Sequence, residues 1–271
     1  MPDDRDKFAV LRRCVRVWAV ASIHGEVDRL IHLHDRLAER IVVGDRLVYL
    51  GNYLGRGPAV GATIDCLLDF RRWLITAPTM FVSDVVFLRG AQEEMWRKLL
   101  QLQFAPNPRE VYGWMLNHGI GPTIAAYGFD PEAGNAQARA GVVQLTRWTS
   151  QLRAAAKSRP GHEALMAALR RAAYTDDGAL LFVHAGVDPA RPLSAQSDSL
   201  WWATTAFSRI DRPIDGFRRV IRGFDPEHRG VTVGEFTVSI DAGCGFGGPL
   251  IGAALGALAG CGIAFTVDPA D

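Results

Sequence analysis

Apolar and polar positions along the chain follow two different periods. Three apolar, β-branched runs in the first hundred residues predict buried strands. They span 15–22, 46–51 and 84–90. Each run precedes a segment with apolar residues at helical spacing. These expected helices span 26–41, 58–74 and 93–103. The repeated strand–helix order favours parallel strands with helices packed on the faces of a sheet.

The second half of the chain changes its pattern twice. Residues 95–177 are mostly helical in pattern, with no clear strand, and indicate a lobe inserted into a single domain of residues 1–271. The run 178–186 predicts a strong buried strand, and the pattern after it is rich in β signals. Gly234 is expected to mark a hairpin turn within 230–243.

Composition is that of a folded globular protein. The chain has 271 residues, of which 48% are hydrophobic and 22% charged, with a net charge of +1. So small a net charge predicts no general attraction to nucleic acid or to anionic membranes. The uncharged segment 249–267 is as long as a short membrane helix, but it lacks basic and aromatic flanks. Two buried strands with a tight turn are the preferred interpretation.

Cysteine usage and the N-terminus both favour the cytoplasm. The four cysteines show neither a C-x-x-C pair nor cysteine–histidine spacing, so they are interpreted as reduced, packed thiols. They are Cys14, Cys66, Cys244 and Cys261. The first residues, MPDDRDKFAVLRR, lack the apolar run of a signal peptide.

Candidate chemistry lies in the turns that follow the predicted strands. Ligands of open α/β sheets bind beyond the carboxyl ends of the strands. The turns to consider are 22–26, 51–57, 89–94, 183–189 and 222–228. Each turn follows a predicted strand, and several contain a histidine, an arginine or an amide beside glycine.

The series of turns resembles the motifs of the calcineurin-like metallophosphoesterases, in particular the serine/threonine phosphatase and diadenosine-tetraphosphatase branch. YLGNYLGRGP resembles the family's LGDYxDRGP, FLRGAQEEM resembles LRGNHEEM, and FVHAGVDP resembles HAGIxP. Five blocks occur in the family's order over nearly the whole chain. The resemblance implies a four-layer α/β/β/α fold, in which helices flank a β-sandwich, with a helical inserted lobe.

The resemblance also implies where a two-metal centre would lie. In the family, two aspartates, an asparagine and three histidines hold the metals. The corresponding residues here are Ser22, His24, Asn52, Ala91, His184 and Phe224. The family's acid dyad corresponds to Gly55 and Gln92. Both carboxylates among the ligands are replaced, so we expect no metal cofactor. A weaker alternative is a single Mn, Fe or Zn ion at His24, Asn52 and His184.

Three arginines near these turns could hold a phosphate without metals, because a guanidinium offers a planar set of donors. They are Arg56, Arg89 and Arg222. The structural alternative is that each arginine pairs with a neighbouring carboxylate such as Glu93, Glu94 or Asp225. The sequence leaves both interpretations open.

These observations predict a pseudophosphatase, a non-catalytic module of the phosphatase fold that binds a protein partner or a phosphate-bearing ligand. The alternative is an active phosphatase or dinucleoside-polyphosphate hydrolase with an atypical metal site. A third reading is a structural subunit of a larger assembly. The apolar tail 243–267 is a candidate surface for self-association. Neither a nucleic acid nor a membrane is expected as a partner.

Overall fold

A five-stranded sheet forms one half of the β-sandwich in the computed structural model, which describes residues 7–256 and 263–267. Its strand order is β11-β10-β2-β3-β4. The strands are β2 (Arg16–Val20), β3 (Asp45–Tyr49), β4 (Val85–Phe87), β10 (Gly252–Gly256) and β11 (Ile263–Val267). β2, β3 and β4 are parallel, as predicted, and β10 and β11 pair antiparallel. The expected turn between β10 and β11 lies outside the described residues.

The second sheet has six strands in the order β1-β5-β6-β7-β9-β8. The strands are β1 (Phe8–Leu11), β5 (Ala172–Thr175), β6 (Leu180–Val183), β7 (Arg219–Arg222), β8 (Thr232–Val233) and β9 (Thr237–Ser239). Gly234 turns the chain between β8 and β9, as expected, and its N–H donates to the Thr237 carbonyl at 2.8 Å. The sequence did not predict β1 or β5. Each has only four residues, and β5 reads AAYT, so neither gives a long apolar run.

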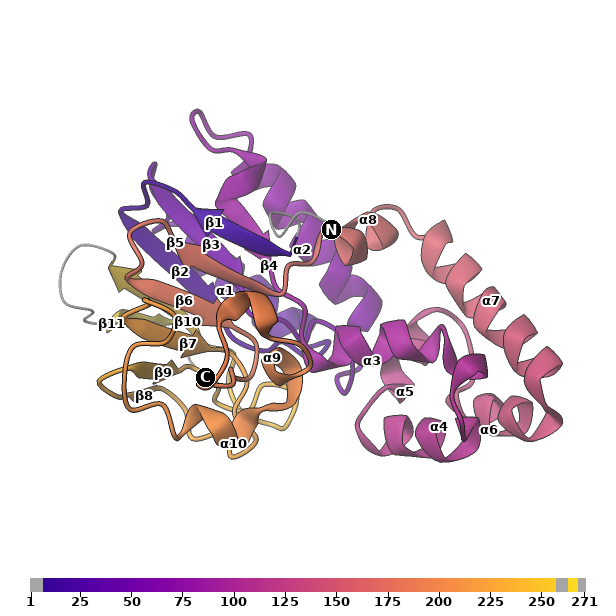
Figure 1. The fold of residues 1–271 in the computed structure, drawn as a ribbon. Coiled ribbons are helices and arrows are strands. Elements are labelled where there is room, and N and C mark those ends of the chain that lie inside the picture. Colours follow the sequence, from indigo (N-terminus) through magenta and orange to yellow (C-terminus); the bar gives the residue numbers. More distant parts are fainter. Residues whose placement is uncertain (1–6, 257–262, 268–271) are drawn as a thin grey trace.

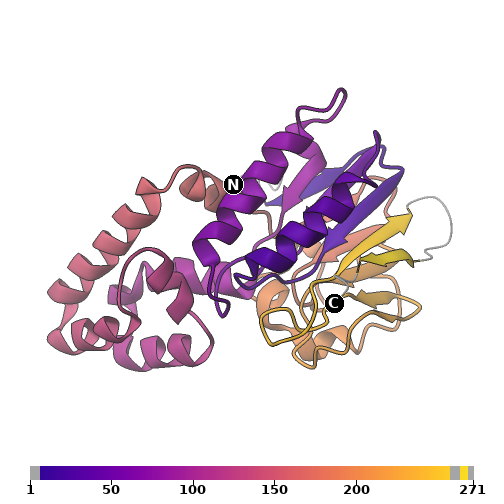
Figure 2. The same cartoon turned by 180° about the vertical axis from the view of Figure 1, so that it is seen from behind.

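Helices cover the outer faces of both sheets and complete the four predicted layers. The helices α1 (Val27–Ala38) and α2 (Val60–Leu74) lie over the five-stranded sheet, in front of it in Figure 2. The short helices α9 (Ser199–Trp202) and α10 (Thr204–Phe207) lie on the side of the six-stranded sheet. Between the sheets, fully buried apolar side chains from both halves pack together. Val17, Val48, Phe182 and Ile221 are among them.

The segment between β4 and β5 is helical except for short connections. It contains α3 (Ala91–Leu99), α4 (Pro108–Asn117), α5 (Gly121–Ala126), α6 (Pro131–Ala140), α7 (Val142–Ser158) and α8 (His162–Ala168). Figure 1 shows α4–α7 in an arm that projects from the sandwich. Tyr112, Met115 and Trp148 are buried inside this arm. Their cluster is continuous with the core beneath α1 and α2, so the arm is packed onto the sandwich.

None of the described helices is long and apolar enough to cross a membrane. Cys14, Cys66 and Cys244 are free thiols. Cys261 lies outside the described residues.

Candidate functional site

Loops that follow five strands meet at one edge of the sandwich. They carry the predicted residues Ser22, His24, Asn52, Gly55, Ala91, Gln92, His184 and Phe224. Main-chain hydrogen bonds tie these loops together. The N–H of Ser22 donates to Gly223 O at 3.0 Å, and the N–H of His24 donates to Asn52 O at 2.6 Å. Gly223 in turn donates to His184 O at 3.0 Å. The fold therefore brings the loops after β2, β3, β6 and β7 into one site.

Glu93 holds the shape of the loop after β3. Its side chain is buried, and its carboxylate accepts four main-chain N–H groups. Oε1 accepts from Tyr53 at 2.8 Å and Leu54 at 3.1 Å, while Oε2 accepts from Asn52 and Gly90 at 2.8 Å each. Sequence reasoning treated Glu93 only as a partner for an arginine. In the structure, one carboxylate fixes the turn 52–54 against the start of α3.

The side-chain amide of Asn52 is engaged by its neighbours on both its oxygen and its nitrogen. The side-chain Nδ2 lies 3.2 Å from His24 Nε2 and 3.4 Å from Ser22 Oγ. The side-chain Oδ1 accepts from the N–H of Gln92 at 2.9 Å. An amide can donate and accept at once, whereas a carboxylate only accepts. The residue therefore closes a hydrogen-bonded network among the site loops.

The two positions of the family's acid dyad are packed against each other. Gly55 has φ +82°, and a Cβ added there would meet the Gln92 side chain at 2.3 Å, far inside normal contact. Gln92 Nε2 donates to His118 O at 2.8 Å, and its Oε1 is buried with no hydrogen-bond partner among the described residues. Gln92 thus occupies the place that a side chain at position 55 would need. Ala91, the first residue of α3, is also buried.

Both site histidines are buried and neutral at pH 7. Burial lowers the pKa of His184 to about 4, although its Nδ1 hydrogen bond to Leu50 O at 2.7 Å acts in the opposite direction. Burial, followed by the charge of Arg56, lowers the pKa of His24 to about 3. Each ring keeps one nitrogen without a hydrogen-bond partner among the described residues, His24 Nδ1 and His184 Nε2. The site therefore holds two neutral imidazoles with unused polar atoms.

Aromatic side chains line the same site. Phe224 stacks on His184 with the ring centroids 5.6 Å apart, and the Phe246 ring lies edge-on to His24 at 5.5 Å. His228 lies 4.1 Å from Phe246, and its Nδ1 is 2.8 Å from Asp241 Oδ2. Sequence reasoning singled out Phe224 but missed Phe246 and His228. His228 lies in the turn 222–228 that was expected at the site, whereas Phe246 lies outside all five of those turns.

The three candidate phosphate-binding arginines differ in their partners. Arg89 lies 3.4 Å from Glu94, and Arg222 lies 2.8 Å from Asp225. Arg56 instead stacks over Phe246, with Cζ 4.0 Å from the ring centroid. Its buried Nε has no hydrogen-bond partner, and no ion pair involves it in the described part of the chain. Arg56 is therefore the cation of the three that is left available for a ligand.

Backbone strain concentrates in these loops. Four residues other than glycine adopt positive φ angles here, a conformation that side chains disfavour. They are His24 (56°), Asn52 (56°), Arg56 (50°) and His228 (49°). Such strain persists only where the surroundings enforce it, and it is typical of functional sites. Their clustering is therefore consistent with a functional site at these loops.

The residues present do not fit a two-metal centre. Two adjacent divalent ions need anionic oxygen ligands and a bridging carboxylate. None of the eight positions carries a carboxylate, and the described residues contain no group of three or more histidine, cysteine, aspartate or glutamate side chains that could hold a metal. The carboxylates on adjoining segments are engaged elsewhere. Glu93 binds main-chain N–H groups, Glu94 and Asp225 bind arginines, and Asp241 binds His228.

Comparisons with solved structures, but not with sequences, identify proteins that share this fold. No protein-family model and no curated protein matches the sequence. A candidate diadenosine tetraphosphatase superposes with a TM-score of 0.56 at 18% identity, over 98% of this chain and 99% of that chain. A serine/threonine phosphatase from Saccharomyces cerevisiae gives 0.51 at 14% identity, over 97% and 84% of the two chains. A cold-active protein-tyrosine phosphatase from a Shewanella species gives 0.51 at 15% identity, over 95% and 78%.

These similarities extend over most of every chain, although identity is low. They agree with the order of the five motif blocks and with the two-sheet sandwich flanked by helices. The chain therefore has the fold of the calcineurin-like metallophosphoesterases.

Proposed function

We propose that this chain is a pseudophosphatase, a binding or scaffolding module that has kept the phosphatase fold without two-metal catalysis. The observation that carries the proposal is the replacement of every carboxylate at the metal and acid-dyad positions. Asn52, in the place of the bridging ligand, is closed into a network with Ser22, His24 and Gln92. The Asn52 amide therefore finds hydrogen-bond partners for both its oxygen and its nitrogen without a cation.

The ligand of this module is an anion, and a phosphate-bearing molecule fits the site. Arg56 offers a guanidinium with no competing carboxylate, and Phe246 supports its flat face. If Asn52 Nδ2 donates to His24 Nε2, neutral His24 carries its proton on Nδ1, which has no partner among the described residues. Arg56 and His24 are close enough for the arginine charge to lower the histidine pKa. Together they supply two donors to one anion.

Binding of phenylphosphonate tests this assignment by isothermal titration calorimetry. Phenylphosphonate has a carbon–phosphorus bond in place of the ester bond that a phosphatase would hydrolyse. The measured heat therefore reports binding alone. Arg56→Ala should weaken binding at least about tenfold, because it removes a charge-assisted donor. Arg209→Ala removes an exposed arginine elsewhere and should change affinity less than about twofold. Equal affinity of Arg56→Ala and the wild type would contradict a role for Arg56.

A hydrolase with an atypical metal site is the second candidate. The unused ring nitrogens of His24 and His184 favour it, since neutral imidazole is a ligand for Mn, Fe and Zn. Turnover of p-nitrophenyl phosphate and of diadenosine tetraphosphate separates the two functions. If the chain is a pseudophosphatase, the wild type should show no metal-dependent turnover above that of the His184→Ala variant. A rate that requires both His184 and an added metal would establish the hydrolase instead.

A further inference from the structure

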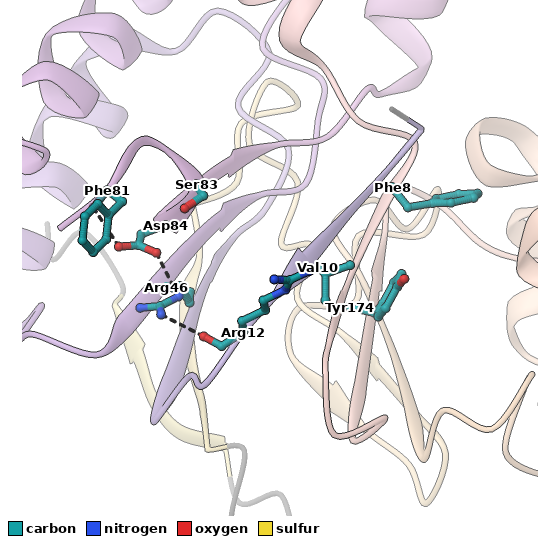
Figure 3. A pocket seen from close by; sticks show the side chains of 8 residues that line it. All are labelled: Phe8, Val10, Arg12, Arg46, Phe81, Ser83, Asp84 and Tyr174. Atoms are coloured by element: carbon teal, nitrogen blue, oxygen red, sulfur yellow. Dashed lines mark hydrogen bonds and ion pairs between the residues drawn. The ribbon is translucent and has the colours of Figure 1, made fainter. Parts of the chain in front are cut away.

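Two cavities lie beside the edge strands β1 and β4, and none of their lining residues belongs to the candidate site. β1 ends the six-stranded sheet and β4 ends the five-stranded sheet. Cavities of about 620 and 650 Å³ lie where these strands and the segment 81–84 come together. Figure 3 shows Arg46 between Asp84 and Arg12, the residue that directly follows β1, while Val10 lies beside Tyr174. Arg46 and Asp84 lie where β3 and β4 begin, whereas the candidate site follows the ends of the strands.

The outer edge of β1 has main-chain groups free to pair. β1 runs parallel to β5, with Leu11 opposite Thr175, and the Leu11 carbonyl accepts from the N–H of Asp176 at 3.1 Å. In a parallel pair, residues that bond to the partner strand alternate with residues whose N–H and C=O point away. Ala9 and Leu11 therefore face β5, and the main-chain groups of Phe8 and Val10 face outward. No further strand of the described residues pairs with this edge.

Apolar side chains border this edge. Val10 is 38% exposed, and across the cavity Phe81 and Val82 are 64% and 55% exposed. An exposed edge strand with apolar neighbours is a template for another strand. Peptides that bind in this way gain affinity from main-chain hydrogen bonds and specificity from alternate side chains.

The charges around the cavities select the kind of peptide. The charged side chains that line them include three arginines, Arg12, Arg46 and Arg71, and the carboxylate of Asp84. Asp84 is paired with Arg46 at 3.1 Å. The Nε of Arg71 is buried with no hydrogen-bond partner among the described residues. The surplus is positive, so a second copy of this edge would bring like charges together, whereas an acidic segment would meet complementary charge.

We infer that the β1 edge is a docking site for an extended acidic peptide of a partner protein. The peptide adds a strand beside Phe8–Leu11, places apolar side chains against Val10 and Phe81, and directs carboxylates toward Arg12 and Arg71. This site is independent of the anion site at Arg56, and neither proposal requires the other.

Selection from a random phage-displayed library of peptides about twelve residues long tests the inference without assuming a sequence. The selected peptides should be enriched in aspartate and glutamate. The most abundant one is then synthesised with a fluorescent label, and its affinity is measured by fluorescence anisotropy.

Val10→Pro removes the outward N–H at the edge, a position at which an edge strand tolerates proline. It should weaken binding at least about tenfold, whereas Val10→Thr should change it less than about twofold.

A second variant keeps the test decisive if Val10→Pro does not fold, which circular dichroism would show. Arg12→Glu combined with Arg71→Glu reverses two charges, and it should weaken binding of the acidic peptide at least about tenfold at low salt. Four results would each overturn the inference. They are failure to enrich any peptide, enrichment without acidic residues, undiminished binding to Val10→Pro, and undiminished binding to the charge-reversal variant.

Discussion

Asn52 shows how one side chain can change the chemistry of a loop without changing its backbone. It keeps φ at 56°, and its main chain still bonds to Glu93 and to the loop after β2. Its Nδ2 donates toward Ser22 and His24, which an aspartate could not do. At the residue scale, the Asn52 amide therefore acts as an internal hydrogen-bonding group that links three site loops.

Asn52→Asp should lower the free energy of unfolding by about 1–3 kcal/mol, because it leaves buried polar groups without a donor. Urea denaturation at pH 7.5 measures this loss. Asn117→Asp makes the same change on the exposed end of α4 and should cost less than about 0.5 kcal/mol. Equal stability of Asn52→Asp and the wild type would mean that the amide does not act as a donor in the network.

The loop after β3 and the start of α3 form one element through Glu93. Four N–H groups from two separate segments converge on its carboxylate. Hydrogen bonds to a charged acceptor are stronger than those to a neutral one. This contact explains how the loop holds its strained shape without a bound ion at Glu93.

Glu93→Ala should lower the free energy of unfolding by about 3–5 kcal/mol, since it leaves four N–H groups without their buried acceptor. Chemical denaturation compares it with Glu227→Ala, which removes a carboxylate that is 67% exposed and should cost less than about 0.5 kcal/mol. If the two variants lost equal stability, Glu93 would not be the anchor of the loop.

At the scale of elements, the sequence predicted the strands that lie within longer apolar runs and missed β1 and β5. The run 84–90 revealed β4 because it is apolar and β-branched, whereas the four-residue β5 lies inside a range that reads as helical. The site was predicted where motif blocks supplied it, as for Asn52. The turn that carries His228 was expected at the site, but Phe246 could not be predicted, because it lies outside the candidate turns and only the tertiary fold brings it to His24 and His228.

The whole molecule carries three buried histidines with strongly lowered pKa values. Burial is the main cause for His24 and His34, at about 3, and for His184, at about 4. An unfolded histidine has a pKa of about 6.5. Between about pH 6.5 and 4 the unfolded chain therefore binds more protons than the native protein, so stability falls as the pH falls.

Each of these histidines should remove about 1.4 kcal/mol per pH unit in that window, or about 4 kcal/mol per unit together. Urea denaturation at pH 7.5 and 5.5 measures the loss. His184→Gln should reduce the slope of the free energy of unfolding against pH by the contribution of one proton, about 1.4 kcal/mol per pH unit. A free energy of unfolding that stays constant over this range would show that the buried rings are not kept neutral.

Calorimetric titration of the wild-type protein with Mn²⁺ tests most directly the proposal that the site at His24, Asn52 and His184 holds no pair of divalent ions. Without carboxylate ligands, no stoichiometric binding is expected up to about 1 mM Mn²⁺. The contrary result is two ions per chain bound at micromolar concentration, with binding abolished by His24→Ala and unaffected by His32→Ala.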